Sequence, residues 1–557
     1  MARRRPRRAA ATGFGDGRVR LLTGLLLVAL LVVAGRATLL AATSNDLSAI
    51  AASQQTKQVD LPAHRGAILD RTGKELAAGR EQHTVYATPS LIEDPETAAR
   101  RLAQALGVKA APIRRALQDR RSQFAYVARK VDPAAARRAV RLDIPGVGSY
   151  PEELRLYPMK KLAAQVIGFA GTDNKGLAGI ELAFDDELSG TPGSQDVVHD
   201  PAGMVLSTER RSEPVDGKDV RLTIDADVQF EAENVLQATV GSTGAVAAQA
   251  VVMDPQDGSV LAMVNVPRID ANRYGKQPQN ARNRVVTDVL EPGSIFKVVT
   301  VAAALEERIV TPETAFVLPP SIQVGDKEIH EAHARGTETF SVRRILVESS
   351  NVGAATLGLK LGKERLMEWI SAFGFGRPTG IDYPGEVGGL VPDYWSLATI
   401  GNVPMGQGIS TTVLQMAAAY ATIANGGVAV SPRLVEQVGD DLRVPKAGRP
   451  VIGAGTAAQV LDMMHDVVES GTGTRARIPG YEVAGKTGTA QKVLVGQAGY
   501  AEGRYIASFV LLVPADEPRL LVMVVVDEPH PIWGGVVAAP AARDIARFAL
   551  AHLKIAP

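Results

Sequence analysis

The sequence contains no cysteine among its 557 residues. That absence excludes a disulfide scaffold, a cysteine nucleophile and a thiolate metal site. Charge is also nearly balanced, with a net value of +1, so the bulk composition does not favour a nucleic-acid partner. Internal repeats and long low-complexity linkers are missing as well. What remains is a globular composition, and a chain of this length is expected to form two or more domains.

The N-terminus combines a basic cluster with a long apolar run. Arginines crowd the first twenty positions, and residues 21–42 form a run of 22 that is charged only at Arg36. About 20 apolar residues span a bilayer core as a helix, and basic residues ahead of it favour a cytoplasmic N-terminus. A cleaved signal peptide is the alternative, although its apolar region is usually about 7–15 residues long. We therefore expect a single-pass anchor in the cell membrane, with the rest of the chain outside the cytoplasm.

The segment between this anchor and residue 225 mixes strand-like runs with helical patterns. Helices are predicted at 95–107, 110–121 and 133–141, where apolar residues recur at helical spacing. Turn signals such as Asp70-Arg71-Thr72-Gly73 punctuate the segment. We expect a first exported domain of mixed helices and strands over residues 43–225.

Beyond residue 225, helical patterns alternate with apolar strands. Strands are predicted at 247–253, 260–264, 506–513 and 520–526, and a closing helix at 538–553. The last two strands are expected to be neighbours, because only the turn 514–518 separates them. Strands at both ends of the segment predict an α/β body whose sheet the C-terminal strands complete. The sequence thus predicts a basic tail (1–20), an anchor (21–42) and two exported domains (43–225 and 226–557).

The first candidate catalytic motif is Glu291-Pro292-Gly293-Ser294-Ile295-Phe296-Lys297, which precedes an apolar helical run. Residues three apart share one face of a helix, so Lys297 is expected beside Ser294. A serine hydroxyl becomes a nucleophile when a neighbouring base removes its proton, and a crowded lysine with a lowered pKa can be that base. Taken alone, the pair is more simply interpreted as a helix cap followed by an exposed lysine.

The second motif is Ser349-Ser350-Asn351. Ser349 is predicted to pass a proton between the lysine and a leaving amine, while Asn351 orients Lys297 and holds a substrate amide. The same residues also suit the N-cap of a helix over 352–361, where Ser and Asn are common. The two interpretations are compatible.

The third motif is Lys486-Thr487-Gly488-Thr489. Its glycine lets a backbone approach a ligand closely, as on a strand beside a binding site. Lys486 is predicted to supply a fixed charge for a substrate carboxylate, and residues Thr487, Gly488 and Thr489 to bind the substrate. The N–H groups of Thr489 and Ser294 are expected to form an oxyanion hole. Residues 480–487 also match the nucleotide-binding P-loop pattern, but an apolar strand before it and a helix after it are missing, so we discount nucleotide binding.

The three motifs occur in the order known from class A β-lactamases and penicillin-binding proteins, with Ser350 in place of the usual Asp. On these motifs the chain resembles the class B penicillin-binding proteins, of the division-type (FtsI-like) kind. Further stretches that carry the resemblance are 65–71 with Gly73, 176–181, 188–190, 282–284, 406–408 and 425–427.

The resemblance implies a multidomain α+β and α/β protein: one transmembrane helix, an elongated pedestal domain and a serine β-lactamase-like transpeptidase domain with a central antiparallel sheet flanked by helices. It implies that Ser294 is acylated by a peptidoglycan stem peptide, also as part of a lipid-linked precursor, and that an amine of a second stem completes the cross-link. β-Lactams would acylate Ser294 as covalent inhibitors. The implied partners are an FtsW-like membrane glycosyltransferase and other divisome proteins. Neither a cofactor nor a metal is implied.

Several other functions share part of this pattern. An elongation-type transpeptidase of the same class and a hydrolase, either a D,D-carboxypeptidase or a β-lactamase, would use the same acylation chemistry. A β-lactamase would not need a large domain ahead of its catalytic domain, so we favour cross-linking. A β-lactam sensor needs a cytoplasmic output domain that the short basic tail cannot supply. A scaffold role in division is compatible with catalysis.

Two further clusters receive no role. His330 and His333 are three apart, as a metal-binding pair on a helix would be, but a third ligand of matching spacing is missing. We therefore interpret His330-Glu331-Ala332-His333 as a solvated surface. The segment Asp527-Glu528-Pro529-His530 is interpreted as a loop without a role in the chemistry.

Overall fold

The computed structural model describes residues 16–199, 205–494 and 499–557. Its contacts divide the chain into two units, the first formed by Met1–Ala63 and Thr191–Val215 and the second by His64–Gly190 and Asp216–Pro557. All three sequence motifs lie in the second unit.

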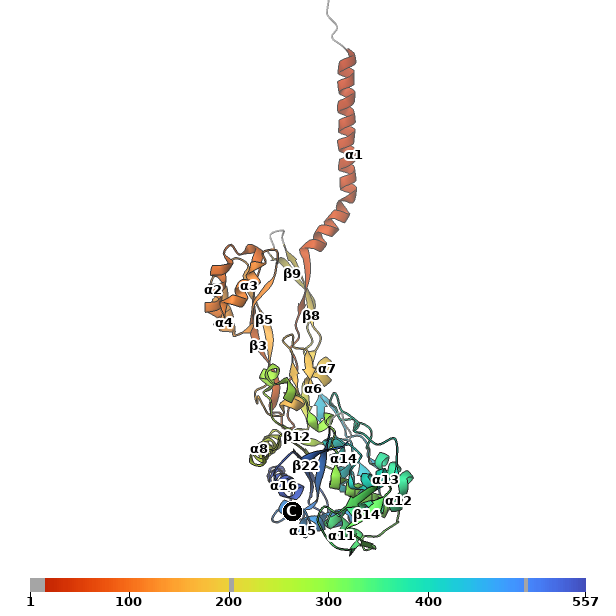
Figure 1. Cartoon of the computed structure of the whole chain (residues 1–557). Coiled ribbons are helices and arrows are strands. Elements are labelled where there is room, and N and C mark those ends of the chain that lie inside the picture. Colours follow the sequence, from red (N-terminus) through yellow and green to blue (C-terminus); the bar gives the residue numbers. More distant parts are fainter. Residues whose placement is uncertain (1–15, 200–204, 495–498) are drawn as a thin grey trace, which may run out of the picture. The chain divides into compact units, whose positions relative to one another are not determined.

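The first unit contains the apolar N-terminal helix. Helix α1 (Asp16–Gln55) includes the predicted anchor and continues well past residue 42. Its stretch Gly17–Ala42 has a mean hydropathy of 2.4 and is not buried against other parts of the protein, so it is long and apolar enough to cross a membrane. The unit also holds an antiparallel sheet of β1 (Thr56–Leu61), β8 (Gly193–His199) and β9 (Val205–Ser212), with β8 in the middle (Figure 1).

The second unit begins with a module of three helices on a small sheet. The sheet is antiparallel, and its strands are β3 (Glu75–Ala87), β4 (Ala125–Val131) and β5 (Val147–Leu156). Its helices are α2 (Pro95–Leu106), α3 (Ala110–Gln118) and α4 (Pro133–Val140). They pack on the sheet around Val85, Leu102 and Ile113. Asp94 and Asp132 cap α2 and α4, which confirms helices where the sequence predicted them.

This sheet continues into the C-terminal half of the chain. Its strand order is β19-β18-β10-β2-β3-β4, and β5 also pairs with β3. The added strands are β2 (Ile68–Leu69), β10 (Val220–Leu222), β18 (Val435–Val438) and β19 (Asp441–Leu442). Because β18 and β19 lie far beyond residue 225, backbone hydrogen bonds join the segment before residue 225 directly to the segment after it.

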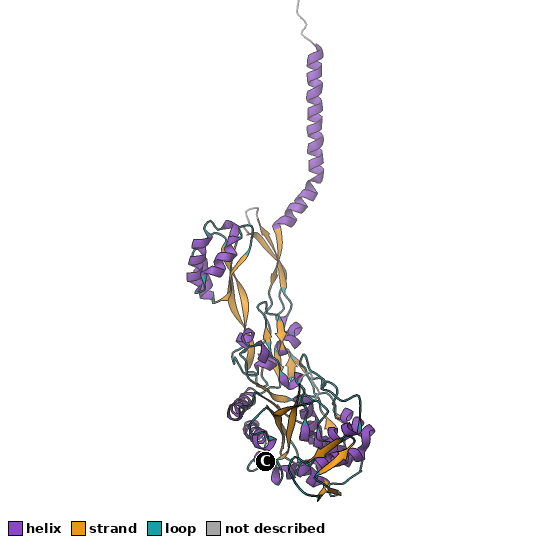
Figure 2. Cartoon of the chain, in the orientation of Figure 1, coloured by secondary structure: helices purple, strands orange, loops and turns teal. Residues whose placement is uncertain are grey.

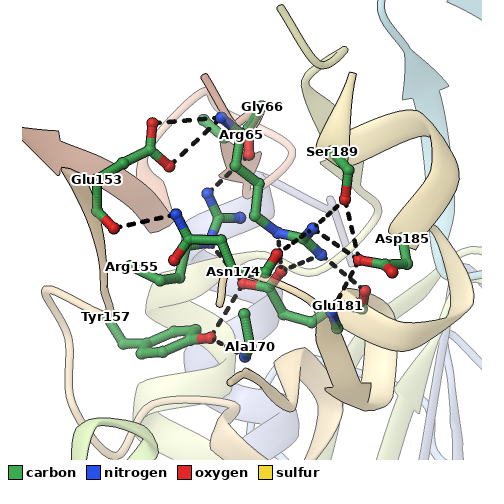
Figure 3. A network of polar contacts seen from close by, with 12 residues as sticks. Arg65, Gly66, Glu153, Arg155, Tyr157, Ala170, Asn174, Glu181, Asp185 and Ser189 are labelled. Carbon is green, nitrogen blue, oxygen red and sulfur yellow. Dashed lines mark hydrogen bonds and ion pairs between the residues drawn. The ribbon is translucent and has the colours of Figure 1, made fainter. Parts of the chain in front are cut away.

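A buried network of charged side chains lies where the stretches 65–71, 176–181 and 188–190 meet (Figure 3). Glu181 is fully buried and accepts hydrogen bonds from Arg65 Nε at 2.8 Å, from Arg155 Nε at 2.6 Å and from the Tyr157 hydroxyl at 3.1 Å. Arg65 also donates to Asp185 Oδ1 at 2.7 Å. Three of the stretches that carried the family resemblance therefore share one structural role, which is to assemble this network.

The C-terminal half is built on a five-stranded antiparallel sheet of order β12-β11-β23-β22-β21. Its strands are β11 (Ala247–Met253), β12 (Val260–Val266), β21 (Ala484–Val493), β22 (Tyr500–Val513) and β23 (Leu520–Asp527). The pairing of β22 with β23 confirms the predicted neighbours, and strands from both ends of the segment share the sheet as predicted.

Helices cover both faces of this sheet (Figures 1 and 2). Helices α8 (Ala226–Thr243) and α16 (Gly534–Leu553) share one apolar core with it, and α16 begins ahead of the predicted residue 538. The core on the opposite face includes α10 (Lys297–Glu306), α14 (Val413–Ala424) and α15 (Ala454–Glu469).

The remaining elements are one long helix, α12 (Asn351–Ala372), and a set of short helices and strands. Further helices are α5 (Ala164–Ile167), α6 (Gly179–Ala183), α7 (Asp185–Ser189), α9 (Arg284–Thr287), α11 (Val342–Val347) and α13 (Leu397–Asn402). Further strands are β6 (Phe169–Ala170), β7 (Gly176–Ala178), β13 (Ala315–Leu318), β14 (Ser321–Val324), β15 (Lys327–His330), β16 (Glu338–Ser341), β17 (Val428–Ala429) and β20 (Arg449–Pro450).

Candidate active site

Ser294 lies at the start of a helix, as the turn before it predicted. It belongs to the 3₁₀ turn η4 (Gly293–Phe296), which leads directly into α10, and the N–H of Lys297 donates to the carbonyl oxygen of Ser294. Side chains three apart in a 3₁₀ turn lie one above the other. The spacing therefore places Lys297 on the side of the helix that carries the Ser294 hydroxyl. Ser294 is partly exposed, whereas Lys297 is fully buried.

Two glycines shape the turn that precedes Ser294. Gly293 has a φ of +56°, and its N–H donates to the carbonyl oxygen of Gly406 at 3.0 Å. A Cβ on Gly406 would lie 2.1 Å from the carbonyl oxygen of Gly293, so only glycine lets the two backbone segments approach this closely. The stretch 406–408, which carried part of the family resemblance, thus supports the turn of the predicted nucleophile.

The second motif forms the turn between α11 and α12. Ser349 has a φ of +57°, an uncommon left-handed conformation for a residue other than glycine. Lys297 Nζ donates to the carbonyl oxygen of Ser349 at 2.5 Å and to Asn351 Oδ1 at 2.7 Å, and it lies 3.4 Å from Ser349 Oγ. Ser350 caps α12 by accepting the N–H of Gly353, so the predicted helix cap stands beside the lysine contacts.

The third motif reaches the same serine from the sheet. Lys486 lies within strand β21, and its Nζ donates to Ser349 Oγ at 2.9 Å and to the carbonyl oxygen of Thr487 at 3.1 Å. Ser349 Oγ therefore has a lysine amine from each of two different elements within hydrogen-bond distance. Because Lys486 sits inside a strand rather than at the start of a helix, the P-loop interpretation is excluded.

The residues after Lys486 are held by their own surroundings. The hydroxyls of Thr487 and Thr472 are 2.7 Å apart, and Thr489 Oγ1 accepts the N–H of Gly534 in α16 at 3.2 Å. A Cβ on Gly488 would lie 2.2 Å from the hydroxyl oxygen of a serine in the neighbouring strand β22. A side chain at this position would therefore crowd the neighbouring strand, a packing reason for glycine that the sequence pattern did not indicate.

Both lysines of the site are buried without a carboxylate partner. Among the residues that the structure describes, neither Lys297 nor Lys486 forms an ion pair. Burial lowers the pKa of Lys297 to about 7, against a smaller opposing effect of Glu331. Burial also lowers the pKa of Lys486 well below its usual value, and the nearby Lys297 lowers it further. Near neutral pH the amine of Lys297 can thus accept a proton, which activation of a serine hydroxyl requires.

Hydrogen bonds bring together four of the five predicted catalytic side chains. Lys297, Ser349, Asn351 and Lys486 form one cluster, whereas the hydroxyl of Ser294 has no hydrogen-bond partner among the described residues. Ser294 is linked to the cluster through the backbone, one turn before Lys297. Hydrogen bonds to a nucleophile often tighten only when substrate is bound.

The interpretation of residues 330–333 as a solvated surface is wrong for one of them. His330 and His333 are exposed, but the side chain of Glu331 between them is buried and accepts hydrogen bonds from Ser350 and Asn351. The local sequence carried no signal for this contact, because its partners lie about 20 positions further along the chain.

A second buried glutamate, Glu291, lies three residues before Ser294. It accepts the N–H of Gly408 at 2.8 Å and the hydroxyl of Tyr500 at 3.1 Å. Burial raises the pKa of Glu291, while these two hydrogen bonds oppose that rise. The residue thereby ties the turn of Ser294 to the stretch 406–408 and to strand β22.

One group of metal-type ligands is found in the described part of the chain, and it lies outside the motifs. It consists of Asp225, Asp227 and His552. Asp225 caps α8 and pairs with His552 at 3.1 Å, and Asp227 pairs with Lys74 at 2.7 Å. Because these ligand atoms already have protein partners, we assign no metal to the group.

Comparisons with known proteins agree with this geometry. Residues 248–547 match the penicillin binding protein transpeptidase domain, and residues 60–222 match the penicillin-binding protein dimerisation domain. The chain is 32% identical to the peptidoglycan D,D-transpeptidase FtsI of Escherichia coli, over 98% of this chain and 93% of that one. It is 35% identical to the penicillin-binding protein PbpB of Mycolicibacterium smegmatis, over 90% and 84% of the two chains.

A solved structure extends the likeness to the fold. Penicillin binding protein 3 of Mycobacterium tuberculosis, complexed with aztreonam, matches with a TM-score of 0.71 and 31% identity over 89% of this chain and 98% of that one. The predicted two-part fold is thereby confirmed, and the apolar helix α1 together with the FtsI-like relatives indicates a single-pass membrane protein. The matched domains, the order of the three motifs and the buried lysines agree, and the chain therefore belongs to the class B penicillin-binding proteins of the FtsI type, as a serine-type transpeptidase.

Proposed function

We propose that this protein is a D,D-transpeptidase that cross-links peptidoglycan stem peptides, with Ser294 as nucleophile and Lys297 as its base. The observation that carries the proposal is the convergence of two fully buried amines, those of Lys297 and Lys486, on Ser349 Oγ one turn from Ser294. Relatives named peptidoglycan D,D-transpeptidase support the substrate class.

In the first half-reaction, neutral Lys297 takes the proton of Ser294 as Oγ attacks the carbonyl carbon of the penultimate D-alanine. The N–H groups of Ser294 and Thr489 stabilise the oxyanion that forms. In a strand, the backbone groups of alternate residues face the same edge. The carbonyl oxygen of Thr487 accepts a hydrogen bond from Lys486 Nζ, which lies in the site. This contact supports the placement of the N–H of Thr489 on the edge that faces the site.

Collapse of this intermediate breaks the bond to the terminal D-alanine, whose nitrogen needs a proton to leave. Ser349 Oγ lies within reach of both lysine amines, so it supplies a route from Lys297 to the leaving nitrogen. Asn351 keeps Lys297 in place through its Oδ1. The products are an ester on Ser294 and free D-alanine.

In the second half-reaction, the amine of a neighbouring stem attacks the ester carbonyl and gives its proton to Lys297. The ester bond breaks, Ser294 Oγ recovers a proton, and a new amide links the two stems. A β-lactam undergoes the same attack, but its opened ring has no separate leaving group, so the acyl-enzyme persists.

We also propose that Lys486 binds the substrate carboxylate, the role that the sequence suggested. Burial lowers the pKa of Lys486 well below its usual value, and the nearby Lys297 lowers it further, so burial opposes the charged form of this amine. An arriving carboxylate raises the pKa of a neighbouring amine, so binding of the substrate carboxylate favours the charged form of Lys486. We assign Thr487, Gly488 and Thr489 to the same substrate-binding strand.

Labelling with a fluorescent penicillin tests the proposal on the full chain in detergent. The natural protein should form a stable covalent adduct, and so should the control Ser242→Ala, which alters an exposed serine on α8. Ser294→Ala should form none. An adduct on Ser294→Ala would overturn the assignment, and rapid release of the opened penicillin would identify a hydrolase. Release of D-alanine together with cross-linked stems from a lipid-linked precursor would establish transpeptidation over carboxypeptidase activity.

We also propose how the chain is divided at the membrane. Residues 1–20 lie in the cytoplasm, 21–42 span the membrane, and the pedestal (43–225) and transpeptidase (226–557) domains lie outside. The arginines before the apolar helix support this orientation. Protease added to intact spheroplasts should degrade the exported part and leave a cytoplasmic N-terminal tag intact. Loss of the tag would refute the orientation.

The proposed cellular role is septal wall synthesis, with an FtsW-like glycosyltransferase and other divisome proteins as partners. It is supported by relatives named FtsI and by the stage V sporulation protein D of Bacillus subtilis, which is 34% identical over 92% of this chain. Depletion should make cells filament, whereas rounding would indicate elongation. Expression of Ser294→Ala in depleted cells separates the enzyme from a scaffold, because only a scaffold would restore septation.

A further inference from the structure

A buried carboxylate lies under the second motif. Glu331 directly follows strand β15, and its side chain is only 8% exposed, although the side chain of the preceding His330 is 64% exposed. A buried carboxylate is costly unless it is paired and hydrogen-bonded. The residues that pair with Glu331 therefore indicate what the carboxylate does.

Both carboxylate oxygens of Glu331 hold the start of helix α12. Ser350 Oγ donates to Oε1 at 2.5 Å, and the backbone N–H of Asn351 donates to Oε2 at 2.8 Å. The neighbouring carbonyl oxygen of His330 accepts Asn351 Nδ2 at 2.9 Å. With Nδ2 engaged there, the amide of Asn351 directs Oδ1 toward Lys297 Nζ.

The charge of Glu331 is itself held in place by an arginine. Arg335 Nη2 lies 2.6 Å from Glu331 Oε1, and Arg335 Nη1 donates to the carbonyl oxygens of Leu318 and Gly336, each at 2.8 Å. The guanidinium also lies 4.7 Å from the ring centre of Phe340. Arg335 thus holds the same carboxylate that contacts the second motif.

We propose that Glu331 is a positioning residue of the transpeptidase reaction, which fixes Ser350 and Asn351 so that the lysine base stays aligned with Ser294. The inference rests on the proposed roles of Ser294 and Lys297 and extends them to a residue outside the three motifs. Glu331 touches neither the substrate nor the reacting atoms in this scheme, and it acts through Asn351.

Glu331 also has an electrostatic effect on the base. The charged groups near Lys297 are Lys486 of β21 and Glu331 of the segment after β15, and Glu331 is paired with Arg335. The negative charge of Glu331 raises the pKa of Lys297 and so opposes the effect of burial. Loss of that charge should lower the pKa of Lys297, whereas loss of Arg335 should raise it.

The test compares acylation rates of Glu331→Gln, Arg335→Gln and the control Glu328→Gln across pH. Glu328 is a half-exposed carboxylate in β15 that contacts Ser321 and His330 rather than the motifs. The readout is the second-order rate constant for a fluorescent penicillin on the full chain, with the melting temperature measured in parallel. Glu331→Gln should slow acylation roughly 10- to 100-fold, because small misplacements of a catalytic group have effects of this size.

The pH profile separates positioning from a merely structural role. The acid limb of the rate profile should move to lower pH in Glu331→Gln and to higher pH in Arg335→Gln, while Glu328→Gln should leave rate and limb unchanged. If Glu331→Gln fails to fold, two other variants provide the test. Arg335→Gln should show the shift of the acid limb to higher pH, and Glu331→Asp, which keeps the negative charge, should leave the limb at its natural pH. Acylation of folded Glu331→Gln at the natural rate and with an unshifted limb would overturn the inference. Failure of the natural protein to form an adduct would instead refute the proposed function.

Discussion

Among the buried clusters of ionisable residues in the second unit, those around Glu181 and around Ser349 are built on opposite plans. Around Glu181, two arginines face two carboxylates, those of Glu181 and Asp185. Around Ser349, two lysines converge on hydroxyl, carbonyl and amide oxygens. Glu181, Lys297 and Lys486 are all fully buried, so the clusters differ in pairing rather than in exposure.

The presence or absence of ion pairs predicts different roles for the two clusters: a structural role around Glu181 and a chemical role around Ser349. A buried ion pair with additional hydrogen bonds keeps its charges, and removal of one partner leaves the other uncompensated. A buried amine without a counter-ion instead gives up its proton, which makes it a base. The comparison predicts that substitutions in the Glu181 cluster alter stability, whereas substitutions in the lysine cluster alter chemistry.

The largest effect is expected from Lys297→Met. Loss of the base should slow acylation by about 10³-fold or more, while the free energy of unfolding changes by less than about 2 kcal/mol because no ion pair is broken. Stopped-flow labelling and thermal unfolding measure the two quantities. Lys492→Met is the matched control on β21, since Lys492 pairs with Asp527 and Glu528, and it should acylate at the natural rate. Equal losses of rate in both variants would break the comparison.

Glu181→Gln should show the opposite pattern. It leaves the guanidinium groups of Arg65 and Arg155 without their shared carboxylate, which should cost about 3–5 kcal/mol of unfolding free energy. Acylation per folded molecule should stay unchanged. Denaturant titration measures the loss, and Asp186→Asn, an exposed neighbour, provides the control. A folded variant with natural stability would show that the network is dispensable.

The pH dependence of acylation sharpens the comparison further. The pKa of Lys297 is lowered to about 7, and only the neutral amine is a base. The rate should therefore be near its maximum above that value and fall roughly tenfold per pH unit below it. The free energy of unfolding should also rise with pH because of this lysine. The pKa of Lys297 is lowered only in the folded state, so the unfolded chain binds more protons at neutral pH. A rate that is flat between pH 5 and 8 would contradict an unpaired lysine base.

The smallest effect is expected from Tyr157→Phe. The hydroxyl donates to Glu181 Oε1 and accepts the N–H of Ala170, so its removal should cost about 1 kcal/mol or somewhat more. Thermal unfolding measures the loss, and Tyr394→Phe, at an 81% exposed position, is the control. Acylation should be unaffected in both. A drop in acylation rate with Tyr157→Phe would show that the two clusters are coupled.

The catalytic motifs could be predicted from the sequence because each keeps its chemistry within a few adjacent residues. Ser294 and Lys297 are one turn apart, so local helix geometry alone places them together. The strands 247–253 and 520–526 were likewise evident as apolar runs, and they pair as neighbours in the sheet. The roles of the individual site residues remain predictions that the variants above test.

Other features depended on contacts that no local pattern reports. In the sequence, Glu331 lies in a polar stretch that predicts an exposed surface. In the structure it follows the hairpin of β14 and β15, and its carboxylate contacts Ser350. The left-handed backbone of Ser349 is imposed by its surroundings, since serine has little preference for that conformation. The sheet that includes β10 and β18 joins residues more than 200 positions apart, which periodicity cannot reveal.

Strand β21 occupies the end of its sheet, so one of its edges has no partner strand within the described part of the chain. Open edges usually invite unwanted pairing with other chains, and proteins often block them with charge or proline. Here the edge strand is the one that holds Lys486 and Thr489, and it packs beside the turn of Ser294. An extended peptide that adds itself as a temporary sixth strand would be recognised through its main chain rather than its side chains. Pairing through the main chain would leave the side chains of such a peptide largely uncontacted, so an open edge of this kind suits peptides of varied composition.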